Sequence, residues 1–496
     1  MKFELVEEKH IPKFAWLLKC KRNEKKLTLF HGSAIDVGQH FFLEGGWDGE
    51  FNELEFDQSI LFLGSGGKIQ NDKLILSTPN HTLERIYSIE LNNELYFSNS
   101  FPFILNRTQS DTDKNFFQYE EYFATILNGI KDFEKYIPIA NNRKVRLYYC
   151  CNIVIDSKFN TEIQQKQRSP ELHTFEDYTN ALNKYIEKFK KNVNSPDRKK
   201  KYDFITTISA GYDASATSVI AKNHNCQIAV TFDAPAKYKI DSGEQIANLL
   251  KFEKVICDDA NKYLNNTKLI EAEYLCSGEL GTGIIFYTFD KLFEDKVVFM
   301  GERGDKFWST NWPYPNNYYK IVDEIYAGTS MIETRLRLGY IYFPLPVFGA
   351  DKWTDITKIS NSQELKKYSV GGSYDRPIPR KIVEDAGVPR EMFGFKKMGV
   401  GFNYRFDNNK RMESRISKHS LKHYQENYKS KNSLKRFYYF LRFIYFNKEF
   451  YINFIFEKFG IKYRLKVKNH LASNPYTSLD LFNWSVEVIK KRYNKL

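Results

Sequence analysis

Long hydrophobic runs and cysteines are scarce in this sequence. No stretch of about 18 or more uncharged apolar residues occurs, and residues 1–8 lack the apolar centre of a signal peptide, so we expect neither a transmembrane segment nor secretion. The six cysteines among 496 residues include no C-x-x-C pair, which argues against a disulfide framework and against a zinc site. These absences predict a cytoplasmic protein.

Acidic residues are outnumbered by basic ones. The 61 Asp and Glu against 74 Lys and Arg leave a net charge of +13. That charge would suit a polyanionic partner such as ATP, an anionic glycan, anionic lipid or RNA, although a solvated basic surface would have the same composition. We expect no DNA partner. The chain is too long for one hydrophobic core, so we expect at least two domains, and an oligomer is possible.

The first part of the sequence has the pattern of an antiparallel β-rich domain. Short alternating segments are separated by turn residues, such as those at 64–67 and 91–93. A helix is expected over 117–127 and a helix-like segment around Cys20. The expected strands are 27–30, 60–63, 74–77, 85–90 and 94–98, and residues 136–149 are expected to form a loop that leads into a further strand.

Further along the chain, strands and helices alternate. Apolar residues step by three and four over 175–193, which predicts an amphipathic helix that packs on a second domain, and a polar linker follows at 194–201. We place the two domains at residues 1–170 and 171–496. A parallel sheet, with ligands beyond the carboxyl ends of its strands, is predicted from strands at 203–208, 228–232, 254–256 and 297–300 and from helices at 214–223 and 242–250.

Residues 204–222 carry the clearest chemical motif. An apolar β-branched run, a small polar turn and a helical repeat predict a strand, an anion-binding loop and a helix. Ser209, Gly211 and Ser215 would offer hydroxyls and close backbone approach to a phosphate. Asp213 suits that loop only if a cation separates its carboxylate from the phosphate, so we expect a magnesium-bound nucleotide. The alternative is a strand-to-helix turn with an N-capping side chain.

Two later segments complete the candidate site. Directly after the strand at 297–300, Glu302 and Asp305 form an acidic pair in a glycine-containing turn at the mouth of the expected sheet, which is typical of a metal or catalytic site. Residues 380–402 contain an expected helix, a proline turn and a lysine pair before Met-Gly. Taken alone, that lysine pair would be a solvated turn.

The three segments resemble the Ser-Gly-Gly-x-Asp-Ser, Gly-Glu-Gly-x-Asp-Glu and R-x-K-x-G-F motifs of the asparagine synthetases and related PP-loop ATP pyrophosphatases. The sequence departs from the family pattern at Ala210, Ala214, Arg303 and Lys306. No Walker A loop is present, and no G-x-G-x-x-G follows an expected strand.

The resemblance implies a role for each motif residue. Asp213 and Asp305 would hold Mg²⁺ against the pyrophosphate of ATP, and Glu302 would accept the proton of an attacking amine. Lys397, or Lys396 in a shifted register, would be the active-site lysine. The expected nucleotide contacts are Ile208, Ser209, Gly211, Asp213, Ser215, Phe232 and Gly301.

Residues 78–100 resemble, more faintly, the class II glutaminase domain that precedes the synthetase domain in this family. That domain uses an N-terminal cysteine as nucleophile, whereas Lys2 stands at the corresponding position here and Cys20 is the nearest cysteine. The implied fold is a degenerate Ntn-like β-rich domain followed by a PP-loop parallel-sheet domain with a helical C-terminal part. Glutamine hydrolysis by the family's usual route is not expected.

The resemblance implies an ATP-dependent amidoligase. It would activate a carboxylate as an acyl-adenylate and transfer the acyl group to an amine or free ammonia, forming AMP and pyrophosphate. Similarity to members found with surface-polysaccharide pathways suggests small-molecule or glycan carboxylates and amines as substrates. Two alternatives stay open, namely a PP-loop enzyme that modifies RNA and a nucleotide-binding scaffold without catalysis.

After about residue 407 the sequence is helical, basic and aromatic in pattern. Phe437, Tyr438, Leu441, Ile444 and Tyr445 recur at helical spacing. This spacing favours an aromatic core of packed helices, and a weak contact with a membrane surface is the alternative.

Overall fold

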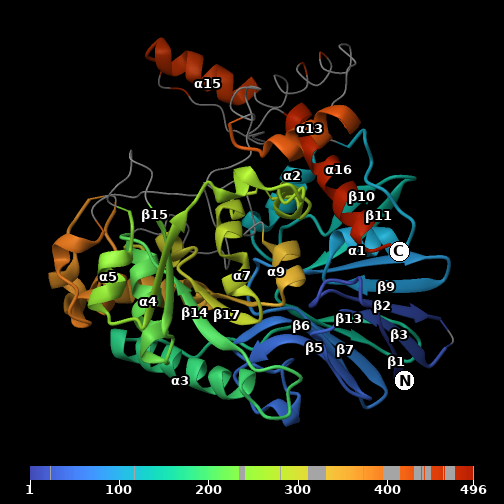
Figure 1. Ribbon diagram of the computed structural model, residues 1–496, viewed down its shortest axis with the longest axis horizontal. Coiled ribbons are helices and arrows are strands. Elements are labelled where there is room, and N and C mark those ends of the chain that lie inside the picture. Colours follow the sequence, from blue (N-terminus) through green and yellow to red (C-terminus); the bar gives the residue numbers. More distant parts are fainter. Residues whose placement is uncertain are drawn as a thin grey trace.

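The computed structural model shows a mixed α/β protein with antiparallel and parallel sheets and helices (Figure 1). A β-rich lobe from the first part of the chain lies beside a lobe built around the parallel sheet. The structure describes residues 1–22, 24–116, 118–233, 241–279, 281–310, 331–372, 374–394, 414–428, 437, 441, 448–461, 463 and 475–494.

The β-rich lobe consists mainly of two sheets that pack through aromatic side chains. The ring of Trp16 in one sheet lies 4.9 Å from the ring of Phe42 in the other. In the described residues the first sheet is antiparallel except for the parallel pair β1–β3, with the order β1 (Lys2–Glu7), β3 (Lys26–His31), β2 (Trp16–Lys21), β9 (Glu94–Ser98), β8 (Ile86–Leu91), β11 (Arg143–Tyr148) and β10 (Tyr136–Ile139).

The second sheet is antiparallel, which confirms the predicted pattern for this part of the chain. Its order is β13 (Thr161–Gln165), β12 (Cys151–Ile155), β7 (Lys73–Ser77), β6 (Phe62–Gln70), β5 (Phe41–Trp47) and β4 (Asp36–Val37). Helices α1 (Phe101–Arg107) and α2 (Tyr119–Ala124) belong to the same part of the chain, and α2 lies within the helix expected over 117–127.

Three local predictions in this lobe are wrong. Cys20 lies in β2, because pairing with strands on both sides decides the conformation of a short apolar run that fits helix and strand equally well. The start of the segment 136–149, expected as a loop, forms β10. The glycines at 64–67 lie inside β6. A Cβ at Gly64 would lie 2.1 Å from the carbonyl oxygen of Glu44, so close approach of β5, not a turn, requires glycine there.

The second lobe is organised around a parallel sheet, as predicted. The strand order is β16 (Lys254–Asp259), β15 (Ile228–Asp233), β14 (Asp203–Thr207), β17 (Lys296–Met300) and β18 (Ile341–Pro344), with every neighbouring pair parallel. Sequence analysis missed β18. From β14 the chain moves outward through β15 and β16, then returns to the other side of β14 with β17. The carboxyl ends of β14 and β17 therefore flank a topological switch point, where open α/β sheets bind ligands.

Helices surround this sheet and continue into the C-terminal part. They are α4 (Tyr212–Asn223), α5 (Glu244–Leu249), α6 (Glu271–Leu275), α7 (Asp290–Phe293), α8 (Gly304–Phe307), α9 (Ile332–Leu338), α10 (Trp353–Ser360), α11 (Pro377–Asp385), α13 (Lys418–Asn427), α15 (Lys448–Lys458) and α16 (Pro475–Arg492). The predicted aromatic core of packed helices is wrong for Phe437 and Leu441, the two residues of that prediction that are described, because they are 59% and 49% exposed. Tyr438, Ile444 and Tyr445 lie outside the described residues.

Helix α3 (Phe175–Val193) matches its predicted bounds and contacts both lobes. Thr174 caps its N-terminus in a capping box with Asp177. On one side the Phe189 ring packs 5.4 Å from Phe343 of β18. On the other, a Cβ at Gly46 of β5 would lie 2.5 Å from the Val193 side chain. The sequence predicted that this helix packs on the second domain, whereas the structure shows that it contacts both lobes.

A buried charge cluster also joins the lobes. Arg335 of α9 makes a bidentate ion pair with Glu44 of β5, at 2.6 and 3.0 Å, and its Nε atom lies 2.7 Å from Glu84. All three side chains are buried. The neighbouring Glu333 accepts hydrogen bonds from Ser100 and from Tyr493, the residue that follows α16. This geometry gives Glu333 and Arg335 a structural role. Within the described residues, no helix combines the length and apolar character needed to cross a bilayer.

Candidate active site

The loop after β14 and the start of α4 have the predicted strand, turn and helix form. The hydroxyl of Ser209 accepts a hydrogen bond from the Gly211 backbone nitrogen at 3.2 Å. Ser215 is fully buried, and its hydroxyl donates to the carbonyl oxygens of Ser209 and Gly211 at 2.7 and 2.8 Å. Ser215 therefore stabilises the loop from its buried side, whereas Ser209 and Gly211 lie on the partly exposed side.

The acidic turn after β17 packs directly against that loop. A Cβ at Gly301 would lie 2.5 Å from the Ala214 backbone nitrogen, and a Cβ at Gly304 would lie 2.4 Å from the Cγ atom of Asp213. Both positions need glycine because the N-terminus of α4 touches the turn at each of them. Asp305 follows Gly304 by one residue, about 3.8 Å along the Cα trace, so both aspartates lie at the switch point.

Asp213 and Asp305 offer carboxylate oxygens, the kind of ligand that Mg²⁺ prefers. In the part of the chain that the structure describes, no three His, Cys, Asp or Glu side chains gather as a metal cage. Mg²⁺ is commonly held by one or two carboxylates together with phosphate oxygens and water, so Asp213 and Asp305 fit a metal that arrives with a nucleotide. They do not fit a metal held by protein ligands alone.

Glu302 has a partner that the sequence did not reveal. Tyr342 of β18 donates a hydrogen bond to the Oε2 atom of Glu302 at 2.6 Å. Burial, reinforced by the Glu302 charge, raises the pKa of Tyr342 far above its usual range, so the phenol keeps its proton at neutral pH. Tyr342 thus fixes one oxygen of Glu302. A signal for this pair was absent from the sequence because β18 itself was not predicted.

The segment that leads to the lysine pair is anchored on the same loop. The backbone nitrogen of Gly394 donates to the carbonyl oxygen of Ala210 at 2.9 Å. The guanidinium of Arg380 donates to the Tyr212 hydroxyl, which ties α11 to α4. Lys396 and Lys397 themselves lie outside the described residues. The chain enters their segment from within hydrogen-bonding distance of the candidate phosphate loop.

Tyr374 is a further residue at this site that sequence analysis missed. Its hydroxyl oxygen lies 3.9 Å from a Cβ placed at Gly211, over the loop. Burial, followed by the charge of Asp213, raises the pKa of Tyr374, so the hydroxyl remains a hydrogen-bond donor at neutral pH. A neutral donor beside the loop could serve a phosphate oxygen.

Residues 241–243 and the end of β15 close another side of the loop. Ala210 donates its backbone N–H to the carbonyl oxygen of Asp241 at 3.1 Å. Burial raises the pKa of the Asp241 carboxyl to about 6. Ile208 is buried beneath the loop, and the Phe232 ring packs against Phe286 and Phe289 at 5.4 and 5.0 Å. The half-buried Phe232 is placed beside the loop by its register in the sheet.

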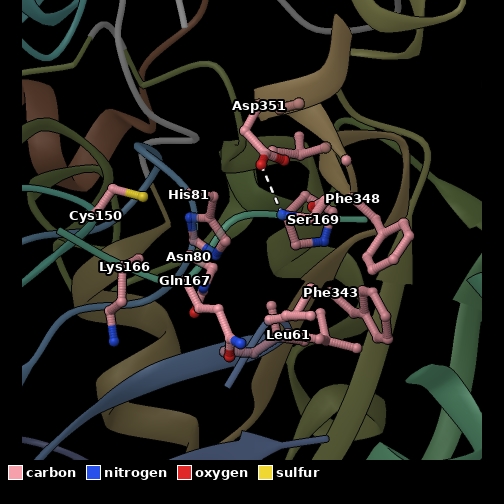
Figure 2. A pocket seen from close by; sticks show the side chains of 16 residues that line it. Leu61, Asn80, His81, Cys150, Lys166, Gln167, Ser169, Phe343, Phe348 and Asp351 are labelled. Carbon is pink, nitrogen blue, oxygen red and sulfur yellow. Dashed lines mark hydrogen bonds between the residues drawn. The ribbon is translucent and has the colours of Figure 1, made fainter. Parts of the chain in front are cut away.

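A separate small cavity is lined by residues of both lobes, including Phe343 and Pro344 of β18 (Figure 2). Its volume is about 30 Å³, which is room for a water molecule but not for a nucleotide. The Asp351 carboxylate accepts a hydrogen bond from the Ser169 backbone at 2.7 Å on one side of it. Other residues that line it are Leu61, Asn80, His81, Cys150, Lys166, Gln167, Phe343 and Phe348. This cavity is therefore too small to be the nucleotide site.

Comparison with known proteins adds no identification. No protein-family model matches the chain, and no curated protein matches it. The functional argument therefore depends on the residues at the switch point.

The contact between Gly304 and Asp213 gives a direct test of this site. In Gly304→Ala the new methyl group must displace the Asp213 carboxyl, and misplacing a catalytic group by about 1 Å can cost on the order of 100-fold in rate. We expect a loss of that size in ATP–pyrophosphate exchange. The control is Gly387→Ala, whose added methyl meets nothing within 4 Å but whose φ of 86° strains the backbone, so it tests general destabilisation away from the site. Equal exchange rates in the two variants, with both folded by circular dichroism, would remove Asp213 from the site.

Proposed function

We propose that the protein is an ATP-dependent amide ligase of the asparagine synthetase-like kind, which forms AMP and pyrophosphate. The observation that carries the proposal is the contact of the loop at 208–215 with the acidic turn at 301–305, at the switch point of a parallel sheet. We also infer that the parallel-sheet lobe is a PP-loop domain and the β-rich lobe a degenerate Ntn-like domain.

In this proposal each part of the site has one task. The backbone of Ser209 and Gly211, at the N-terminus of α4, would bind the phosphates of ATP, with Tyr374 as an added donor. Asp213 and Asp305 would hold Mg²⁺, which when bound offsets the charge that grows on the departing pyrophosphate. Gly301 and Gly304 allow the two loops to approach closely enough for both carboxylates to share one ion.

Transfer to the amine would use Glu302. Glu302, whose Oε2 atom accepts the hydrogen bond from Tyr342, would accept the proton of the attacking amine. Lys397, with Lys396 as the alternative, would neutralise the phosphate or the tetrahedral adduct. The hydrogen bond from Gly394 to Ala210 supports this assignment, because it places Gly394, three residues before Lys397, against the loop.

The nitrogen source is proposed to be free ammonia or an amine on a second substrate. Lys2 lies in β1, and the amino group of Met1 forms an ion pair with Asp72. A nucleophilic cysteine is therefore not available at the position that the glutaminase family uses. We favour a glycan or small-molecule carboxylate as the acid and a cytoplasmic reaction, on the basis of the motif resemblance.

The test is ATP–pyrophosphate exchange with the purified full chain. Exchange that requires both Mg²⁺ and one member of a panel of sugar acids and small carboxylates would support the proposal, because only adenylation of an acid reverses in this way. AMP and amide should then appear when an amine or ammonium is added. Nucleotide binding without exchange for any acid would favour the non-catalytic scaffold, and AMP formation that depends on RNA would favour the RNA-modifying enzyme.

A further inference from the structure

Positive charge and aromatic residues are concentrated in one stretch near the C-terminus. Residues 429–468 contain 11 Lys and Arg against 2 Glu, so this stretch contributes nine of the 13 net positive charges of the chain. The same stretch contains 13 Phe and Tyr. Its basic residues are therefore mixed with large apolar side chains, and the excess charge is not a diffuse property of the surface.

Six of the described residues of this stretch expose large apolar side chains to solvent. Phe459 is 74% exposed and Tyr463 is 66% exposed. Of the large hydrophobic residues that are exposed in the described part of the chain, more than half lie here, namely Phe437, Leu441, Ile455, Phe459, Ile461 and Tyr463. Those elsewhere, such as Leu249 and Val370, are scattered. A gathering of this kind marks an interaction surface.

The local backbone brings several of these side chains together at the end of α15. Ile455 and Phe459 are four residues apart and so share one face of the helix. Gly460 then adopts a left-handed conformation with a φ of 70°, and the backbone nitrogen of Ile461 donates to the carbonyl oxygen of Phe456 at 2.8 Å. This cap turns the chain back, so the Tyr463 ring lies 6.4 Å from the Phe456 ring. In Figure 1, α15 stands apart from both lobes.

We propose that α15 and its flanking residues dock on the surface of an anionic lipid membrane. Leu441, Ile455 and Ile461 have aliphatic side chains, which are stabilised by a binding partner only if it removes them from water. The acyl-chain boundary of a membrane does so, and a polyphosphate does not. Lys448 and Lys458 of α15 are exposed, and the stretch 429–468 as a whole has nine net positive charges, which match anionic headgroups. With 11 residues, α15 is too short to span a bilayer, which takes about 20, so the contact is with the membrane surface.

The experiment is flotation of the full chain with vesicles of phosphatidylcholine alone or of phosphatidylcholine with phosphatidylglycerol. We expect binding to the anionic vesicles only, weakened by salt. The double variant F459S/I461S should lower the partition coefficient at least about tenfold, because it removes two apolar side chains from the interface. The matched control is L249S/V370S, which removes two side chains of similar size at exposed positions away from α15 and should leave partitioning unchanged.

Three results would overturn the proposal. The first is equal flotation of F459S/I461S and the unchanged chain. The second is binding of an RNA oligonucleotide, but of neither vesicle, by the stretch. The third is a dimer in sedimentation velocity that the double variant abolishes while vesicle binding is absent, because the face would then join two copies. The proposal does not depend on the ligase assignment, and pyrophosphate exchange without lipid should be the same in both double variants.

Discussion

Replacement of Asp305 by Asn should lower the rate of ATP–pyrophosphate exchange about 100- to 1,000-fold while the fold is retained. The substitution keeps the shape of the side chain but removes one of the two negative charges that would hold Mg²⁺ at the pyrophosphate. Asp305 lies in the first turn of the one-turn helix α8, beside the contact between Gly304 and Asp213. The measurement is exchange of labelled pyrophosphate at saturating ATP and acid. Asp213→Asn should give a loss of similar size.

The matched control is Asp203→Asn. Asp203 begins β14, at the opposite end of the strand from the candidate site, and its side chain is 78% exposed. Exchange should be unchanged in this variant. If Asp305→Asn also exchanged pyrophosphate at the rate of the unchanged chain, Asp305 would not be a metal ligand and the proposed ligase site would fail.

Replacement of Arg335 by Met should destabilise the protein by about 3–5 kcal/mol. The variant leaves Glu44 and Glu84 buried without the cation that both contact, and uncompensated buried charges cost free energy of this order. Burial already raises the pKa of Glu84 to about 7 with Arg335 in place. Because the Arg335 charge lowers the pKa of Glu84, loss of Arg335 raises that pKa further in the folded state. The stabilising contribution of Glu84 is then present at low pH and is lost as the pH rises.

The destabilisation of Arg335→Met should therefore be larger at pH 8 than at pH 5.5, measured by urea unfolding at each pH. Adding Glu84→Gln in the same chain should recover part of the loss at pH 8, because it removes one uncompensated charge. The control is Lys26→Met, which breaks the exposed ion pair with Glu4 and should change stability little. An Arg335→Met variant as stable as Lys26→Met at pH 8 would show that the cluster does not hold the lobes together.

The candidate site shows which features a sequence can predict. The strand, loop and helix around Asp213 are contiguous in the chain, so hydrophobic period and loop composition were enough to predict them. The meeting of Asp213 with the turn at 301–305 followed from one topological rule, since neighbouring parallel strands present their carboxyl ends at the same edge. Tyr342 and Tyr374 were missed because each is a single aromatic residue without a local pattern.

The wrong predictions have a common cause. Cys20 and the glycines at 64–67 were judged from their neighbours in sequence, yet both lie in strands whose conformation depends on partners distant in the chain. The same holds for Phe437 and Leu441, where helical spacing indicated a core but the structure exposes both side chains. A periodic apolar pattern shows that a face exists, and it does not show what covers that face.

Amino-acid order alone determined four strands of the parallel sheet, the loop before α4 and the acidic turn after β17, because each depends on residues that are adjacent or periodic in the chain. Tertiary structure alone decided that Gly304 touches Asp213, that Tyr342 holds Glu302, and that Arg335 bridges two buried carboxylates. These contacts join residues tens to hundreds of positions apart, and their geometry is set by how whole sheets and helices pack.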